Sequence, residues 1–167
     1  MTNFNYKGVG KKPLLCKPKL DTRDGEKIIK SRIGLSAQCI DLEELMNYPV
    51  NKIAEYDSII VDEVQFATPE QVDLLSDIVD SFDIPVICYG LRSDFQNNLF
   101  PGSERLLAIA DKIREIKTVC WCGKKATCNA RYNENGIVRE GDQVQLGAND
   151  CYVALCRKHF KEGKLHP

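Results

Sequence analysis

The chain has 167 residues, of which 43% are hydrophobic and 28% are charged, and its formal net charge is −1. This length is enough for one main domain with a small appendage. The near-neutral charge argues against a dedicated nucleic-acid-binding surface, which is normally basic. No apolar run approaches the ~20 residues that span a bilayer, and the N-terminus lacks a signal-peptide pattern, so we expect a cytoplasmic protein with no membrane partner.

The N-terminal part of the chain is rich in charge. Residues 1–32 contain nine Lys or Arg against three acidic residues, which indicates either a solvated face or the surroundings of a polyphosphate. The apolar and turn-forming residues predict, in chain order, a buried strand at 13–16, a polar loop at 17–30, a short strand at 37–40 and a helix over 42–46 capped by Asp41.

Residues 58–62 form an apolar run that ends abruptly in two adjacent acids, Asp62 and Glu63. Strands buried on both faces of a parallel sheet read as short continuous apolar runs, and ligands bind beyond their carboxyl ends. Two carboxylates at that point suit a nucleotide phosphate site, where one acid serves Mg²⁺ and the next acts as a base. A buried strand followed by a solvated turn gives the same pattern.

A helix start follows this strand. Thr68 is placed as N-cap, Pro69 at the first helical position and Gln71 at the third, which completes a capping box. The apolar residues then recur at three- and four-residue steps up to Phe82. Further along, the pattern predicts a strand at 84–91, a helix at 103–110 and a strand at 113–119. Strands that alternate with helices predict the α/β class with a mostly parallel sheet.

After Val119 the sequence pattern changes to short strand-like segments separated by turn-forming residues. The segments are 130–132, 137–138, 144–146 and 152–155, and a short helix over about 157–163 follows them. We therefore expect two domains, an α/β core at 1–118 and a small β domain at 119–167.

Two close pairs of candidate metal ligands lie in this C-terminal part, Cys120 with Cys122 and Cys156 with His159. Eight cysteines in a cytosolic chain favour metal ligands or buried thiols over disulfides. Zn²⁺ prefers four tetrahedral sulfur and nitrogen ligands, and two such pairs supply them. Reduced, unligated thiols are the alternative, and Cys128 and Cys151 are possible substitutes. With all positions filled by protein, such a zinc would hold the domain together without catalysing a reaction.

These pieces occur in the order of a known family, and the chain resembles the zinc-containing type II thymidine kinases of bacteria, phages and animals. The matching motifs are Lys17-Pro18-x-x-Asp21-Thr22-Arg23, Ser31-Arg32-Ile33-Gly34-Leu35, Val61-Asp62-Glu63-x-Gln65-Phe66, Tyr89-Gly90-Leu91-Arg92-x-Asp94-Phe95, the four metal ligands and Gly147-x-Asn149-x-x-Tyr152. The resemblance runs from about residue 5 to residue 161.

The resemblance implies a thymidine kinase that transfers the ATP γ-phosphate to the 5′-hydroxyl of thymidine. Glu63 would be the general base, and Asp62 would orient water around Mg²⁺ with help from Asp21. Arg23 would offset charge on the transferred phosphoryl group. Phosphoryl transfer needs mostly positioning and charge stabilisation, so a base, a metal and a cation at one sheet edge suffice. The family also implies a homotetramer.

The resemblance places an apolar slot around the thymine ring and a loop that closes over the base. The slot would be built by Phe66, Leu91, Phe95 and Phe100. The loop residues would be Gln145, Leu146, Gly147, Asn149 and Tyr152, and the zinc would anchor both ends of this lasso. Ordinary core packing is the alternative for each aromatic residue.

The family's phosphate loop, Gly-x-x-x-x-Gly-Lys-Ser/Thr, has no match in these 167 residues. Gly10-Lys11-Lys12 corresponds instead to the turn that leaves the helix after that loop, so we expect a P-loop-kinase-like sheet lacking its first strand. Three explanations are open: a misassigned start, a separate chain that supplies the phosphate loop, or a degraded remnant. The competing hypothesis is therefore a non-catalytic nucleoside-binding or assembly protein.

Overall fold

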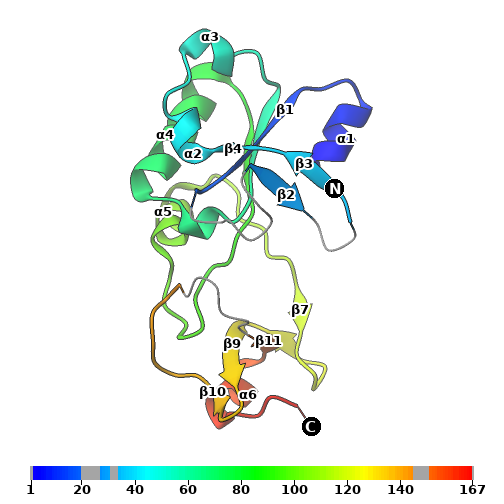
Figure 1. The fold of residues 1–167 in the computed structure, drawn as a ribbon, viewed down its shortest axis with the longest axis vertical. Coiled ribbons are helices and arrows are strands. Elements are labelled where there is room, and N and C mark those ends of the chain that lie inside the picture. Colours follow the sequence, from blue (N-terminus) through cyan, green and yellow to red (C-terminus); the bar gives the residue numbers. More distant parts are fainter. Residues whose placement is uncertain (1, 20–26, 31–33, 145–150, 167) are drawn as a thin grey trace. The chain divides into compact units, whose positions relative to one another are not determined.

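The computed structural model describes residues 2–19, 27–30, 34–144 and 151–166. The chain divides into two compact units, each with its own core (Figure 1). The first unit comprises 1–91 and 101–109, and the second comprises 92–100 and 110–167. The division into functional domains at 1–118 and 119–167 stays a prediction.

A four-stranded parallel sheet forms the centre of the first unit. Its strand order is β4-β1-β5-β6, and the strands are β1 (Pro13–Lys17), β4 (Ile40–Asp41), β5 (Ser58–Val61) and β6 (Val86–Cys88). In the register of the two central strands, Leu14 lies beside Ile59 and Leu15 lies beside Ile60. The predicted α/β class with a parallel sheet is confirmed.

The two central strands are buried along their whole length, which explains their continuous apolar sequence. Because side chains alternate along a strand, Cys16 and Val61 belong to one core cluster, whereas Leu15 and Ile60 belong to a second cluster on the other face. The first cluster is covered by the helices α2 (Leu42–Leu45), α3 (Val50–Ile53), α4 (Pro69–Phe82) and α5 (Pro101–Ile109).

Helix α4 begins as the sequence predicts. The Thr68 side chain accepts a hydrogen bond from the Gln71 N–H at 3.3 Å, and the Gln71 side chain accepts one from the Thr68 N–H at 3.1 Å. This reciprocal capping satisfies two N–H groups that have no partner within the helix. Among the described helices, none is both long enough and apolar enough to cross a bilayer.

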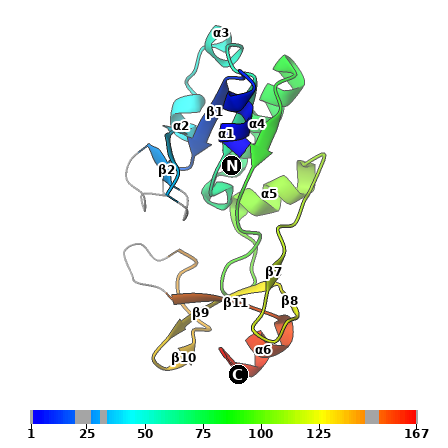
Figure 2. The same ribbon diagram turned by 90° about the vertical axis from the view of Figure 1, so that its right-hand side faces the viewer.

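The other face of the sheet carries α1 (Thr2–Gly8) and a hairpin of β2 (Ile28–Lys30) and β3 (Ser36–Gln38), as Figure 2 shows for α1 and β2. The predicted loop at 17–30 is therefore wrong at its end, where β2 forms. The predicted strand at 37–40 divides into β3 and β4, which belong to different sheets. The division falls at Cys39, whose N–H donates to the Lys27 carbonyl one step beyond the β2–β3 pairs, whereas the next residue, Ile40, pairs with β1 of the parallel sheet.

The second unit is built from short antiparallel strands. One sheet has the order β10-β9-β11, with β9 (Cys128–Asn133), β10 (Gly136–Ile137) and β11 (Cys151–Leu155). A separate pair consists of β7 (Thr118–Val119) and β8 (Lys125–Ala126), and the unit ends with α6 (Arg157–Glu162).

The predicted strand at 113–119 is wrong except at its end, since only β7 forms there and it pairs antiparallel with β8. The apolar residues that suggested a longer strand are exposed, with Ile116 77% accessible. Likewise, the predicted strand at 84–91 is shorter and is limited to β6. In the predicted strand at 144–146, residues 145 and 146 lie outside the described residues.

Gly102 sets how closely α5 approaches the segment after β5. A Cβ at this position would lie 2.7 Å from the Ala67 carbonyl oxygen and closer still to that of Val64. Because both atoms belong to the backbone, they cannot move aside cheaply. We therefore expect Gly102→Ala to reduce the free energy of unfolding by ~1–3 kcal/mol, the usual cost of overpacking.

Chemical denaturation measures this effect, and Gly8→Ala is the matched control because a Cβ at Gly8 meets no atom within 4 Å. Equal stability of the two variants would contradict the close packing of α5.

Candidate active site and metal centre

Asp62 and Glu63 lie directly after β5, at the carboxyl end of the central strands. The Asp62 N–H donates to the Cys16 carbonyl at 3.0 Å, so the parallel ladder extends to the first acid. The Asp62 carboxylate accepts the Glu63 N–H at 3.0 Å. Glu63 has a left-handed backbone, with φ 50° and ψ 35°. Strained backbone of this kind in a residue other than glycine is concentrated at functional sites.

Gln65 fixes the orientation of the Glu63 side chain. It is 1% exposed, and its Nε2 donates to Glu63 Oε2 at 2.5 Å while its Oε1 accepts the Leu91 N–H at 3.0 Å. Gly90 permits this approach, because a Cβ there would lie 2.6 Å from Gln65 Oε1. One amide therefore connects the carboxylate after β5 with the segment after β6.

No role was predicted for Gln65 from the sequence, although this residue lies within the motif that carries Asp62 and Glu63. Its place in that motif was the only signal, since periodicity cannot show that a glutamine is buried between two strand ends. The contact with Leu91 is 26 residues away in sequence.

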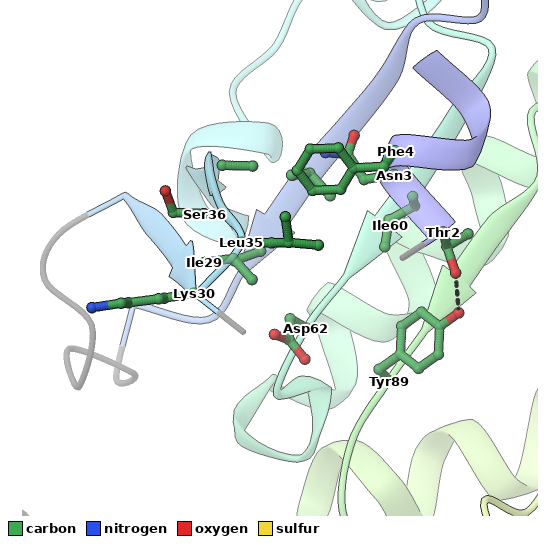
Figure 3. Close-up of a pocket in the computed structure, with 12 residues that line it drawn as sticks. Thr2, Asn3, Phe4, Ile29, Lys30, Leu35, Ser36, Ile60, Asp62 and Tyr89 are labelled. Atoms are coloured by element: carbon green, nitrogen blue, oxygen red, sulfur yellow. Dashed lines mark hydrogen bonds between the residues drawn. The ribbon is translucent and has the colours of Figure 1, made fainter. Parts of the chain in front are cut away.

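A cavity of about 290 Å³ opens beside Asp62, between α1, the β2–β3 hairpin and the sheet (Figure 3). Its walls are largely apolar, with Leu15 and Ile60 from the sheet and Leu35 before β3. The Tyr89 hydroxyl is hydrogen-bonded to Thr2 Oγ1 at 2.7 Å. The cavity thus combines apolar walls with a carboxylate at its edge.

Asp21 and Arg23, which were predicted to act on the phosphate side, lie outside the described residues. Within the described part, Lys17 is a further cation at the carboxyl end of β1. Its side chain is 2% exposed, and its ammonium donates to the Ile28 carbonyl at 3.1 Å. A cation is therefore held at the same end of the sheet as Asp62.

The residues predicted to contact the nucleoside are distributed over both units. Phe66 ends the short 3-10 helix η1 (Val64–Phe66) in the first unit and is half-buried, and Leu91 is exposed. In the second unit Phe95 and Phe100 are buried and Tyr152 is exposed on β11. The remaining predicted residues, Gln145, Leu146, Gly147 and Asn149, lie outside the described residues.

Four side chains of the second unit converge in the manner of a metal site. The candidate ligand atoms of Cys120, Cys122, Cys156 and His159 all lie within 4.8 Å of one another. Cys120 Sγ lies 3.5 Å from His159 Nδ1, and Cys122 Sγ lies 3.9 Å from Cys156 Sγ. Tetrahedral ligands about 2.3 Å from one ion would be about 3.8 Å apart, so the donor set fits a metal such as zinc.

The local backbone explains how Cys120 and Cys122 reach one ion across a single intervening residue. A tight turn brings the Gly123 N–H to the Cys120 carbonyl at 2.9 Å, and the Cys120 N–H to the Lys124 carbonyl at 2.9 Å. Gly123 has φ +80°, a conformation that glycine adopts without strain. Cys156 then caps α6, which carries His159.

Trp121, between the two cysteines, supports the histidine ligand. Its ring stacks on His159 with 4.1 Å between centroids and an angle of 3°. The indole N–H donates to the Lys164 carbonyl at 3.3 Å, which fixes the ring. His159 is thereby held with its Nδ1 directed at Cys120.

The cysteines of this cluster differ in their readiness to ionise. Desolvation opposes ionisation of Cys120, but the backbone N–H groups of Cys122 and Cys156 and the contact with His159 lower its pKa to about 6. For Cys122 a hydrogen bond from the Lys124 backbone is outweighed by desolvation and by the neighbouring sulfurs, so its pKa is raised. A thiolate is the form that binds a metal, so Cys120 is prepared for one.

Cys128, considered above as a substitute ligand, is not part of the described cluster, and its Sγ lies 3.8 Å from the Thr127 hydroxyl. It packs with Ala130, Leu155 and Phe160 in the small core of this unit. The side chain of Cys151 lies outside the described residues.

Comparison with known proteins assigns the chain to a family. The sequence profile of the thymidine kinase family matches residues 2–160. A thymidine kinase of Rhodopirellula baltica is 46% identical over 167 residues, which cover 96% of this chain and 79% of the relative.

A thymidine kinase of Legionella pneumophila strain Lens is 46% identical over 170 residues, covering 98% of this chain and 81% of that protein. A thymidine kinase of Coxiella burnetii is 45% identical over 170 residues, which cover 98% of this chain and 87% of that protein. With its parallel sheet, paired acids and Cys₃His cluster, the chain belongs to the thymidine kinase family, whose members are phosphotransferases that act on thymidine.

Proposed function

We propose that this chain transfers the γ-phosphate of ATP to the 5′-hydroxyl of thymidine, with Glu63 as the general base. The observation that carries the proposal is the hydrogen bond from Gln65 to the Glu63 carboxylate at the carboxyl end of β5. A carboxylate that is held in one orientation can accept a hydroxyl proton without first paying the entropy of ordering.

Asp62 is proposed to face the phosphate side. Mg²⁺ prefers oxygen ligands and retains several waters, so the Asp62 carboxylate, with Asp21 near it in the reaction, would hold the hydrated ion. When bound, Mg²⁺ would supply charge neutralisation for the phosphate oxygens. Arg23 would offset the charge of the transferred group, which is the main requirement of phosphoryl transfer.

The thymine ring is proposed to lie against Phe66, Leu91, Phe95 and Phe100, with Gln145, Leu146, Gly147, Asn149 and Tyr152 around the base edge. Two features support this proposal. The Leu91 backbone is tied to Gln65 and so to the base Glu63. Aromatic walls suit a pyrimidine because flat rings stack on it.

The Cys₃His cluster is proposed to hold a structural zinc. The core cluster of the second unit is small, and three of the seven buried residues described in it are the cysteines 120, 128 and 156. A zinc bound by two loops would cross-link such a unit, because a core of this size supplies little stability alone. We also propose that the protein works in the cytoplasm as a homotetramer, as the family resemblance implies.

The first test is phosphorylation of thymidine by the purified chain with ATP and Mg²⁺. Glu63→Gln keeps the size and the hydrogen bond to Gln65 but cannot accept a proton, so we expect turnover to fall by ~10²–10⁴. Glu70→Gln is the matched control, because Glu70 is an exposed acid in the first turn of α4, and it should leave turnover unchanged.

Thymidine binding, measured by equilibrium dialysis on the same samples, separates this proposal from its alternative. Binding without any phosphate transfer would favour a non-catalytic nucleoside-binding protein. Full turnover in Glu63→Gln would contradict the role of Glu63 as base.

The metal proposal is tested by zinc content. Cys156→Ser removes one of the four converging ligands, so we expect loss of stoichiometric zinc and a lower melting temperature. Cys128→Ala is the control, since its thiol lies in the same core but outside the cluster, and it should retain zinc. Equal zinc loss in both variants would contradict the assignment of these four ligands.

A further inference from the structure

Arg131 is a buried arginine whose contacts converge on residues from separate segments of the second unit. It lies on β9 and is 4% exposed. Its Nε donates to the Tyr152 hydroxyl at 2.9 Å, and its terminal nitrogens donate to the carbonyls of Asp142 at 3.2 Å and Gln143 at 3.5 Å. A guanidinium carries five N–H donors in a fixed planar arrangement, so one side chain can serve three such groups from different directions.

The same guanidinium covers the ring of Phe95. Its central carbon lies 4.0 Å from the Phe95 centroid and 5.5 Å from the Tyr152 centroid, within the range of cation–π attraction. One cation therefore contacts both aromatic rings, Phe95 from the segment 92–100 and Tyr152 from β11.

A second set of contacts fixes the turn that carries Phe95. Gln143 Nε2 donates to Asp94 Oδ2 at 2.9 Å and to the Leu99 carbonyl at 3.2 Å. The other Asp94 oxygen accepts the N–H groups of Gln96 at 2.8 Å and Asn98 at 2.9 Å. Since Arg131 holds the Gln143 carbonyl, its contacts and those of Asp94 form one connected network.

We propose that Arg131 is a positioning residue for the nucleoside: it fixes the Phe95 ring and the Tyr152 hydroxyl in the places where thymidine meets them. This inference rests on the proposed function, which places both residues at the nucleoside. Burying a cation is costly unless it is paired or hydrogen-bonded, and here three acceptors and two rings offset part of that cost. The effect belongs to substrate binding, because neither Phe95 nor Tyr152 takes part in phosphate transfer.

Arg131→Lys tests this inference, since it keeps the charge but loses the planar fork of donors. We expect the thymidine KM and Kd to rise about tenfold, which corresponds to about 1.4 kcal/mol, with kcat, the ATP KM and the zinc content unchanged. Arg139→Lys is the matched control, because Arg139 stacks on Phe160 in the same unit with 4.5 Å between its guanidinium carbon and the ring centroid. It should leave the thymidine KM unchanged.

Tyr152→Phe provides a milder second variant that removes only the hydroxyl. If Arg131 acts through Tyr152, Tyr152→Phe should raise the thymidine Kd, and the double variant should cost less than the sum of the two single changes. Wild-type thymidine affinity in Arg131→Lys would overturn this inference and leave the proposed function unaffected. Loss of zinc and of kcat together with affinity would assign Arg131 a merely structural role, and a wild-type chain without thymidine affinity would overturn the proposed function as well.

Discussion

The two hydrogen bonds of the Gln65 side chain are the constraint on which the candidate active site depends. They join Glu63, just after the central strand β5, to Leu91, which follows the neighbouring strand β6. One of them holds a carboxylate oxygen of Glu63, a residue whose backbone is left-handed. Gly90 and Gly102 support this arrangement, because the lack of a side chain at each glycine allows the segments around Gln65 to approach one another. The parallel sheet brings these strand ends together, and the amide of Gln65 determines how they are aligned.

The two units are stabilised by different physical means. The first unit relies on burial of apolar strands between helices, as the fully buried β1 and β5 show. The second unit has a core dominated by cysteine and alanine, so directional contacts replace apolar area. These contacts are the four converging ligands on one side and the network of Arg131 on the other. Directional contacts fix side chains more precisely than apolar packing does, which suits a unit that holds substrate-facing residues.

Much of the fold could be predicted from the sequence, because its signals are local. The buried run 58–62, the capping box at Thr68 and the ligand pairs of the Cys₃His cluster each reflect neighbouring residues. The strand at 113–119 was predicted wrongly because its apolar residues have no partner strand and lie exposed. Gln65 and Arg131 could not be identified in this way, since their roles come from contacts 26 and 21 residues distant in sequence. The predicted roles of Asp21 and Arg23 stay predictions.

The most direct test of this account is steady-state thymidine phosphorylation by Gln65→Leu, which keeps the buried volume at 65 but removes both hydrogen bonds to Glu63 and Leu91. If Gln65 orients the base, kcat should fall by about tenfold or more, and any rise in the thymidine KM through the lost hydrogen bond to the Leu91 backbone should be the smaller effect. A wild-type kcat in this variant, or a change in KM alone, would contradict the claim that a fixed Glu63 carboxylate is the centre of this site.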